Sequence, residues 1–202
     1  MPLSAAQDHA NLVQLCKWID TTTSGLELPA DEKSMLASGC LDVTLEHQAA
    51  IALLFQAGLH GSMFSLLRVL NESVVRGMWL NLCASPAEVA KFKRGKVDKD
   101  FAQLIADVEA QIGIQSPVLS NLKANAWKAF NGFTHTGLNQ VARRHDGGQL
   151  VGNYPEEEVK QALRVAGALG LVAAGQLVAM STNPGLLPSV SAKMAEYSGH
   201  GA

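Results

Sequence analysis

Apolar residues recur along this chain at the three- and four-residue spacing of α-helices. The repeat is clear over residues 5–22, 30–57 and 62–83, and it returns over 99–112. A helix with such a stripe buries it against its neighbours, and no stretch alternates as a half-buried strand would. The pattern predicts an all-α protein, a single helical bundle of about six to seven helices.

Turn and capping residues divide the pattern into elements. The segment Gly58-Leu59-His60-Gly61 is a tight joint between two long apolar helices, which predicts a central antiparallel hairpin of long helices. A serine-proline pair before a helix supplies a cap and a preformed first turn. Such pairs predict helices over residues 85–94 and 116–144, and Pro155 followed by three glutamates predicts a further helix over 155–181.

The length of 202 residues suits one domain over residues 1–202. Residues 183–202 are mostly small and polar, and they are expected to form a short helical turn and a loosely ordered C-terminal tail. The most membrane-like segment, residues 165–180, is short and contains Gln176. We therefore expect a buried helix there and no membrane partner.

Charge and cysteine usage narrow the classes of partner. Sixteen basic and eighteen acidic residues give a formal charge of -2, which excludes a global attraction to nucleic acid or anionic lipid. Cys16, Cys40 and Cys83 stand singly, without the spacing of a disulfide framework or a zinc knuckle. Together with an N-terminus that lacks the features of a signal peptide, they predict a cytoplasmic protein with no disulfide partner.

The most informative feature is a ladder of charges, Arg68, Glu72 and Arg76, spaced four residues apart in an apolar run. On a helix the three share one face with Phe64 and Trp79. Charges are tolerated in such surroundings when they are paired. The ladder predicts a polar site, with Arg68 and Arg76 as cationic groups and Glu72 as a binding residue; structural ion pairing is the alternative.

His47 is a second candidate for this site. It follows Cys40 and Val43 and precedes Ala50 at helical spacing, so its side chain is expected to point inward. Its role is either a binding contact or that of a core histidine bonded to a neighbouring helix.

The third candidate group lies in the expected helix 116–144. Two glycines, Gly132 and Gly137, flank His135, and each costs a helix about 1 kcal/mol relative to alanine. This cost predicts the close approach of another backbone or a ligand. Asn131 and Thr134 are expected to contribute binding groups beside His135, which is either a general acid/base or phosphate contact, or a histidine bonded to a carbonyl.

These residues carry a resemblance. The run Leu66-Leu67-Arg68-Val69-Leu70-Asn71-Glu72-Ser73, then Trp79-Leu80 and later Asn131-Gly132-Phe133-Thr134-His135, resembles an uncharacterised group of bacterial all-helical proteins. The architecture is similar to that of HEPN domains, which include metal-independent ribonucleases of toxin and phage-defence systems and non-catalytic nucleotide binders. The resemblance implies a bundle, and a dimer in which polar residues of two subunits face a shared cleft.

The chain departs from the catalytic pattern of that family. Catalytic HEPN ribonucleases carry an arginine with a histidine after four to six intervening residues, and no arginine here has a histidine at that distance. The nearest substitutes are Lys128 and Asn131, both before His135. The resemblance implies that Arg68 or Arg76 could supply the arginine from another helix.

Two further features bear on the class of ligand. His47, His60 and His135 could converge on a metal ion, although no cofactor is indicated. The basic run Lys91, Lys93, Arg94, Lys96 and Lys99 is either a phosphate contact or a solvated linker.

The sequence thus favours a non-catalytic binding or structural role for a polar cleft at Arg68, Glu72, Arg76 and His135. The alternatives are a divergent metal-independent ribonuclease or RNA-binding defence effector, and a histidine-ligated metal-binding bundle. A homodimer and an RNA or nucleotide ligand are the expected partners.

Overall fold

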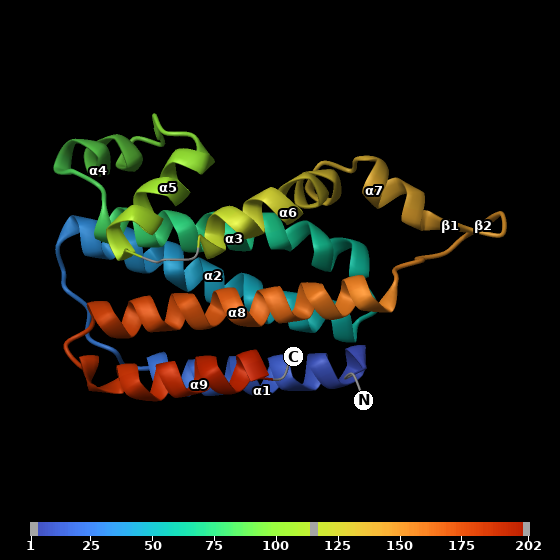
Figure 1. Ribbon diagram of the computed structural model, residues 1–202, viewed down its shortest axis with the longest axis horizontal. Coiled ribbons are helices and arrows are strands. Elements are labelled where there is room, and N and C mark those ends of the chain that lie inside the picture. The colour runs from blue at the N-terminus through green and yellow to red at the C-terminus, as the bar shows by residue number, and fades with distance from the viewer. Residues whose placement is uncertain (1–3, 114–116, 200–202) are drawn as a thin grey trace.

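The computed structural model describes residues 4–113 and 117–199, and these residues form nine α-helices and one minimal pair of strands (Figure 1). The predicted all-α class is therefore confirmed at this level. The predicted start of one helix at Ser116 lies outside the described residues. The helices are α1 (Ala5–Thr23), α2 (Glu32–Gln56), α3 (His60–Leu82), α4 (Pro86–Lys93), α5 (Phe101–Ile112), α6 (Val118–Thr134), α7 (Leu138–Val141), α8 (Glu156–Met180) and α9 (Leu187–Gly199).

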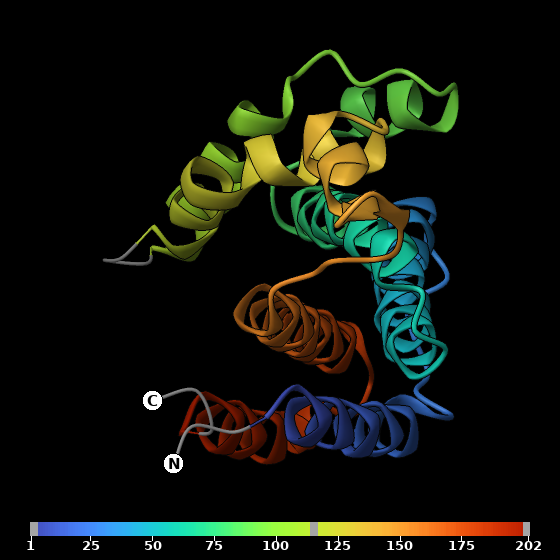
Figure 2. The same cartoon turned by 90° about the vertical axis from the view of Figure 1, so that its right-hand side faces the viewer.

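The core forms around α3 and α8. Helix α8 packs against α1, α2, α3 and α9, while α3 also packs against α5 and α6. In the end-on view α1 and α9 lie side by side beneath α8, and α6 lies above α8, on the side opposite to α1 and α9 (Figure 2). Of the described helices, α8 alone has the length and apolar composition of a membrane span, and most of it is buried inside the bundle, as a core helix would be.

Capping residues set the starts of α4 and α5, and the cap of α4 is the one expected from the sequence. Ser85 and Glu88 form a reciprocal capping box at α4, with Pro86 in the first turn. The hydrogen bonds that Ser85 donates to the Glu88 carboxylate lower the pKa of that carboxyl group. Asp100 and Gln103 form a second capping box at α5.

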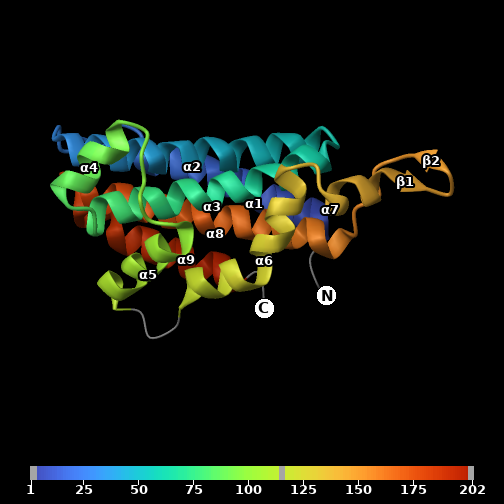
Figure 3. The ribbon, with the colours of Figure 1, turned by 90° about the horizontal axis from the view of Figure 1, so that it is seen from above.

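The region after α6 differs from the prediction. The expected helix 116–144 ends at Thr134, and a short α7, a 3-10 turn over Ala142–Arg144 and two strands, β1 (His145–Asp146) and β2 (Gln149–Leu150), follow. Gly147 and Gly148 both have positive φ, as a two-residue hairpin turn between strands requires. These elements form an arm that extends beyond the end of the bundle (Figure 3).

The C-terminal region also differs. Where a short helical turn and a loose tail were expected, α9 is a 13-residue helix packed on α8. Val190 is buried, and the hydroxyl of Tyr197 donates to the Leu163 carbonyl of α8. The segment has few large apolar residues, so its sequence does not show an obvious buried face. Because α9 packs closely on α8, these few apolar side chains are enough to hold it there.

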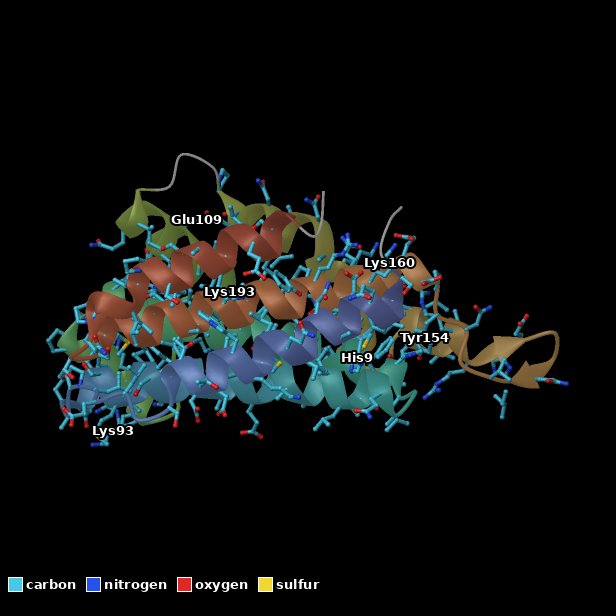
Figure 4. All side chains as sticks on the ribbon, turned by 90° about the horizontal axis from the view of Figure 1, so that it is seen from below. His9, Lys93, Glu109, Tyr154, Lys160 and Lys193 are labelled. Atoms are coloured by element: carbon cyan, nitrogen blue, oxygen red, sulfur yellow. The ribbon has the colours of Figure 1, made fainter. Side chains whose placement is uncertain are left out.

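A row of rings ties one end of the bundle together. His9 stacks on Phe55, which contacts His60, and His60 contacts the edge of Tyr154. Tyr154 in turn stacks on Phe64 of α3. Figure 4 shows His9 on α1 and Tyr154 before α8 at the same end of the molecule, so this row joins the first helix to the segment that leads into α8.

Candidate functional site

The charged ladder lies on one face of α3, as its spacing predicts. Glu72 accepts a hydrogen bond from Arg68 Nε at 2.9 Å, and it forms an ion pair with Arg76 Nη2 at 3.1 Å. The Glu72 side chain is 14% exposed, against 24% for Arg68 and 42% for Arg76. One half-buried carboxylate is thus shared by two guanidinium groups.

His135 reaches this ladder because α6 ends early. It is the C-cap of α6, and Thr136 after it has φ 52°, a left-handed conformation that is rare for a β-branched residue. Gly137 then folds back so that its N–H donates to the Gly132 carbonyl at 2.8 Å. A Cβ on Gly137 would lie 3.1 Å from that oxygen, so the backbone that closely approaches Gly137 is that of its own turn.

The turn brings His135 against Arg68. Arg68 Nη1 contacts the Nε2 atom of His135, and a guanidinium has only donors, so Nε2 is the acceptor. Arg68, Glu72 and His135 therefore form one hydrogen-bonded cluster across two helices, which we call the Arg–His cluster, and Arg76 joins it through Glu72.

Trp127 supports this cluster, and the sequence did not single it out as a site residue. The guanidinium carbon of Arg68 lies 5.2 Å from the centre of the Trp127 ring, and Phe101 stacks on that ring at 4.5 Å. Such a cation–π contact holds a guanidinium in place. The available signal was spacing, because Trp127, Asn131 and His135 share one face of α6.

A cleft of about 450 Å³ opens beside the cluster, between α5 and α6. Trp127 and Asn131 form part of its wall, and Lys123 and Lys128 add two positive charges. The Oδ1 atom of Asn131 is buried without a hydrogen-bond partner among the described residues. The rest of its lining is largely apolar, and the cleft adjoins the Arg–His cluster through Trp127, which contacts Arg68.

Two predicted site residues have other surroundings. Thr134 Oγ1 donates to the carbonyls of Ser65 and Phe130, and Ser65 Oγ donates to the Phe133 carbonyl. These bonds fasten the end of α6 to α3, so Thr134 positions His135 rather than facing a ligand. His47 is only half-buried on α2 and takes no part in the Arg–His cluster.

The buried stripe of α2 explains the place of His47. It lies one position away from the stripe expected from the sequence, and it contains two polar residues. Because of these polar residues the stripe is not recognisable as an apolar one. The buried residues of α2 are Ala37, Leu41, Thr44, Gln48, Ile51 and Ala52. The Thr44 hydroxyl meets Ser73 of α3 at 2.9 Å.

The histidine-ligated metal site does not form from the residues considered. In the part of the chain that the structure describes, no three His, Cys, Asp or Glu side chains gather as metal ligands would. His60 lies instead in the row of rings. Burial raises the pKa of the Cys16 thiol to about 11 and raises those of Cys40 and Cys83, which disfavours the thiolate form that binds metal.

The basic run before α5 is largely paired with acidic side chains. Lys91 contacts Asp98, Lys93 contacts Glu32, and Lys99 lies 3.3 Å from Glu88 and 2.5 Å from Asp107. These pairs lower the local positive charge, which favours the linker interpretation over a phosphate track.

Comparison with known proteins gives a family and no activity. The model of a family described as "Family of unknown function (DUF6988)" matches residues 41–200, which include every residue of the Arg–His cluster. No curated protein and no solved structure matches the chain. The expectation of an uncharacterised family is confirmed, and the resemblance to HEPN domains stays a prediction.

Proposed function

The chain belongs to the family of unknown function DUF6988, and on that premise we propose that it is a non-catalytic protein that binds a phosphate-bearing ligand, RNA or a nucleotide. The proposed site is the polar surface of Arg68, Glu72, Arg76 and His135, beside the cleft between α5 and α6. The observation that carries the proposal is the sharing of one carboxylate by two guanidinium groups beside a cleft lined by two lysines.

The charge of the site supports an anionic ligand. Arg68 and Arg76 contribute two positive charges and Glu72 one negative charge, and Lys123 and Lys128 lie in the adjoining cleft. Arg76 is the most exposed member of the ladder and uses one nitrogen for Glu72. Its remaining N–H donors suit phosphate oxygens, which guanidinium groups bind in paired geometry.

The surroundings of the site support positioning rather than turnover. Arg68 is held by Glu72, His135 and Trp127, so its guanidinium is oriented before any ligand arrives. We also propose an antiparallel hairpin of α2 and α3 in a HEPN-like bundle as the scaffold of the site, and the cytoplasm as its location.

Substitution of Arg76 tests the proposal. We expect Arg76→Gln to weaken the binding of a short fluorescein-labelled single-stranded RNA at least about tenfold, because it removes the exposed phosphate donor. Arg94→Gln, an exposed arginine outside the site, is the matched control and should bind as wild type. The proposal would be overturned if Arg76→Gln bound the RNA as tightly as Arg94→Gln does. It would also be overturned if wild type bound neither RNA nor a nucleotide.

A metal-independent ribonuclease is the second candidate, and the contact between Arg68 and His135 favours it. In such a reaction the ribose 2′-oxygen attacks the adjacent phosphorus and the 5′-oxygen leaves. The imidazole would carry the proton from the 2′-hydroxyl to the 5′-oxygen, and Arg68 would stabilise the charge on phosphorus. This candidate requires that His135→Ala abolish RNA cleavage with an unchanged melting temperature.

We further propose that the chain forms a homodimer through the arm that leaves the bundle after α6. Leu138 and Leu150 on the arm are each 80% exposed, and Val141 and Val151 are also exposed. Exposed apolar side chains on a projecting arm are typical of a partner surface. Sedimentation velocity of wild type and of the double variant Leu138→Ser, Leu150→Ser tests this: the variant should be a monomer.

A further inference from the structure

A second cavity lies on the opposite face of α6 from the Arg–His cluster. It measures about 490 Å³ and is enclosed by α3, α6 and α8, with two residues of the arm at one side. A volume of several hundred cubic ångströms is that of a small-molecule site. Neither Arg68, Glu72, Arg76 nor His135 lines it, so it is distinct from the site described above.

The walls of this cavity are apolar and partly aromatic. Phe64 and Leu67 come from α3, and Phe130 and Phe133 come from α6; all four are buried. Small side chains keep the space open, because Ala126 and Ala129 of α6 face Ala162 of α8 across it. In the end-on view α6 and α8 lie apart from each other on the same side of α3 (Figure 2).

The rim carries four carboxamide side chains, Asn121, Asn125, Asn139 and Gln161. Within the described ranges, none of the four makes a side-chain hydrogen bond. A carboxamide both donates and accepts hydrogen bonds. Four such groups around an apolar cavity provide donors and acceptors without any net charge.

The one charged pair at the cavity is already neutralised. Both oxygens of Glu158 accept from Arg143 Nη2, and the Arg143 guanidinium lies 5.5 Å from the centre of the Phe133 ring. A carboxylate or phosphate entering here would lie beside Glu158 and would compete with it for Arg143. The electrostatics therefore favour an uncharged ligand.

From these observations we infer that the cavity binds a small, uncharged aromatic molecule that carries a carbonyl or carboxamide group. The aromatic part fits the phenylalanine-lined interior, where ring contacts add to the burial of apolar surface. The polar group pairs with the carboxamides of the rim. The two sites then differ in chemistry, one for an anion and one for a neutral aromatic molecule.

Titration calorimetry with two matched probes tests this inference. We expect 2-naphthamide to bind wild type, and 2-naphthoic acid, with the same rings and a carboxylate, to bind at least about tenfold more weakly. Ala129→Phe fills the cavity and should abolish the binding of 2-naphthamide. Ala110→Phe, at an exposed alanine of α5 outside the cavity, should bind the probe as wild type does.

Other results would overturn the inference. These are no binding of 2-naphthamide to wild type, equal binding by folded Ala129→Phe, or tighter binding of the acid. If Ala129→Phe does not fold, Ala126→Phe fills the same cavity from one turn earlier and decides the matter. This test and the test of the proposed function can fail independently. RNA binding is expected to depend on Arg76, whereas the binding of 2-naphthamide is not, because Arg76 does not line this cavity.

Discussion

Glu72 is the residue on which the charge balance of the Arg–His cluster depends. It is the one carboxylate between Arg68 and Arg76, and it is half-buried. We expect Glu72→Ala to lower the free energy of unfolding by about 1–3 kcal/mol, because it removes the carboxylate that the two guanidinium groups share. Urea denaturation followed by circular dichroism measures this change.

Glu46 provides the matched control for that measurement. It is an exposed glutamate on α2, and Glu46→Ala should change the free energy of unfolding by no more than about 0.5 kcal/mol. Equal effects of the two substitutions would mean that the ladder contributes no more than an ordinary surface charge.

At this scale the sequence predicted local contacts and missed tertiary ones. The bonds of Glu72 to its two arginines follow from a spacing of four residues on one helix. The contact between Arg68 and His135 joins residues 67 positions apart, and it depends on the turn at Thr136 and Gly137. No periodic pattern encodes that turn. The sequence could therefore suggest that Arg68 and His135 act at one site, but it could not predict that they are in contact.

The packing of helices depends on two glycines of α8. A Cβ on Gly170 would lie 2.2 Å from the side chain of Gln48, which is itself buried in α2, and a Cβ on Gly167 would lie 2.0 Å from the Tyr197 hydroxyl. We expect Gly170→Ala to lower the free energy of unfolding by about 1–3 kcal/mol through overpacking, although alanine favours the helix itself. Thermal and urea unfolding check the direction.

Gly39 supplies a control of opposite sign. It lies inside α2, and a Cβ there would meet no atom within 4 Å. Gly39→Ala should therefore stabilise the protein by up to about 1 kcal/mol, because only the helical preference of alanine changes. A gain from both substitutions would show that α2 and α8 are less closely packed than these distances require.

Element boundaries show which signals are strong. Ser85, Pro86 and Glu88 fixed the start of α4, because a capping box is made of neighbouring residues. The end of α6 was wrong by ten residues, since Gly132 and Gly137 were interpreted as glycines within a continuing helix. Gly147 and Gly148 follow the expected helix end at residue 144, and with positive φ at both positions they form the turn of a hairpin.

At the scale of the whole molecule, α9 completes the cover of α8. Val190 and Met194 of α9 contact the position of Gly175, and Met194 and Tyr197 pack against the small buried cluster of Leu15, Ile19, Leu171 and Ala174. The chain therefore brings its first and last helices together beneath α8 (Figure 2). The small residues of α9, considered alone, predict a loose tail. The apolar surface that α9 covers belongs to α1 and α8, so the sequence of α9 does not reveal it.

Two aspartate substitutions on α9 distinguish a docked helix from a loose tail. Val190 is 2% exposed, whereas Ala192 is exposed on the same helix. We expect Val190→Asp to lower the melting temperature by at least about 6 °C, because an unpaired charge is forced against the core. Ala192→Asp should leave it within about 1 °C, because its carboxylate stays in water. A loose tail would tolerate both substitutions equally, so equal melting temperatures would contradict the docking of α9 and, with it, the closed arrangement of α1, α8 and α9.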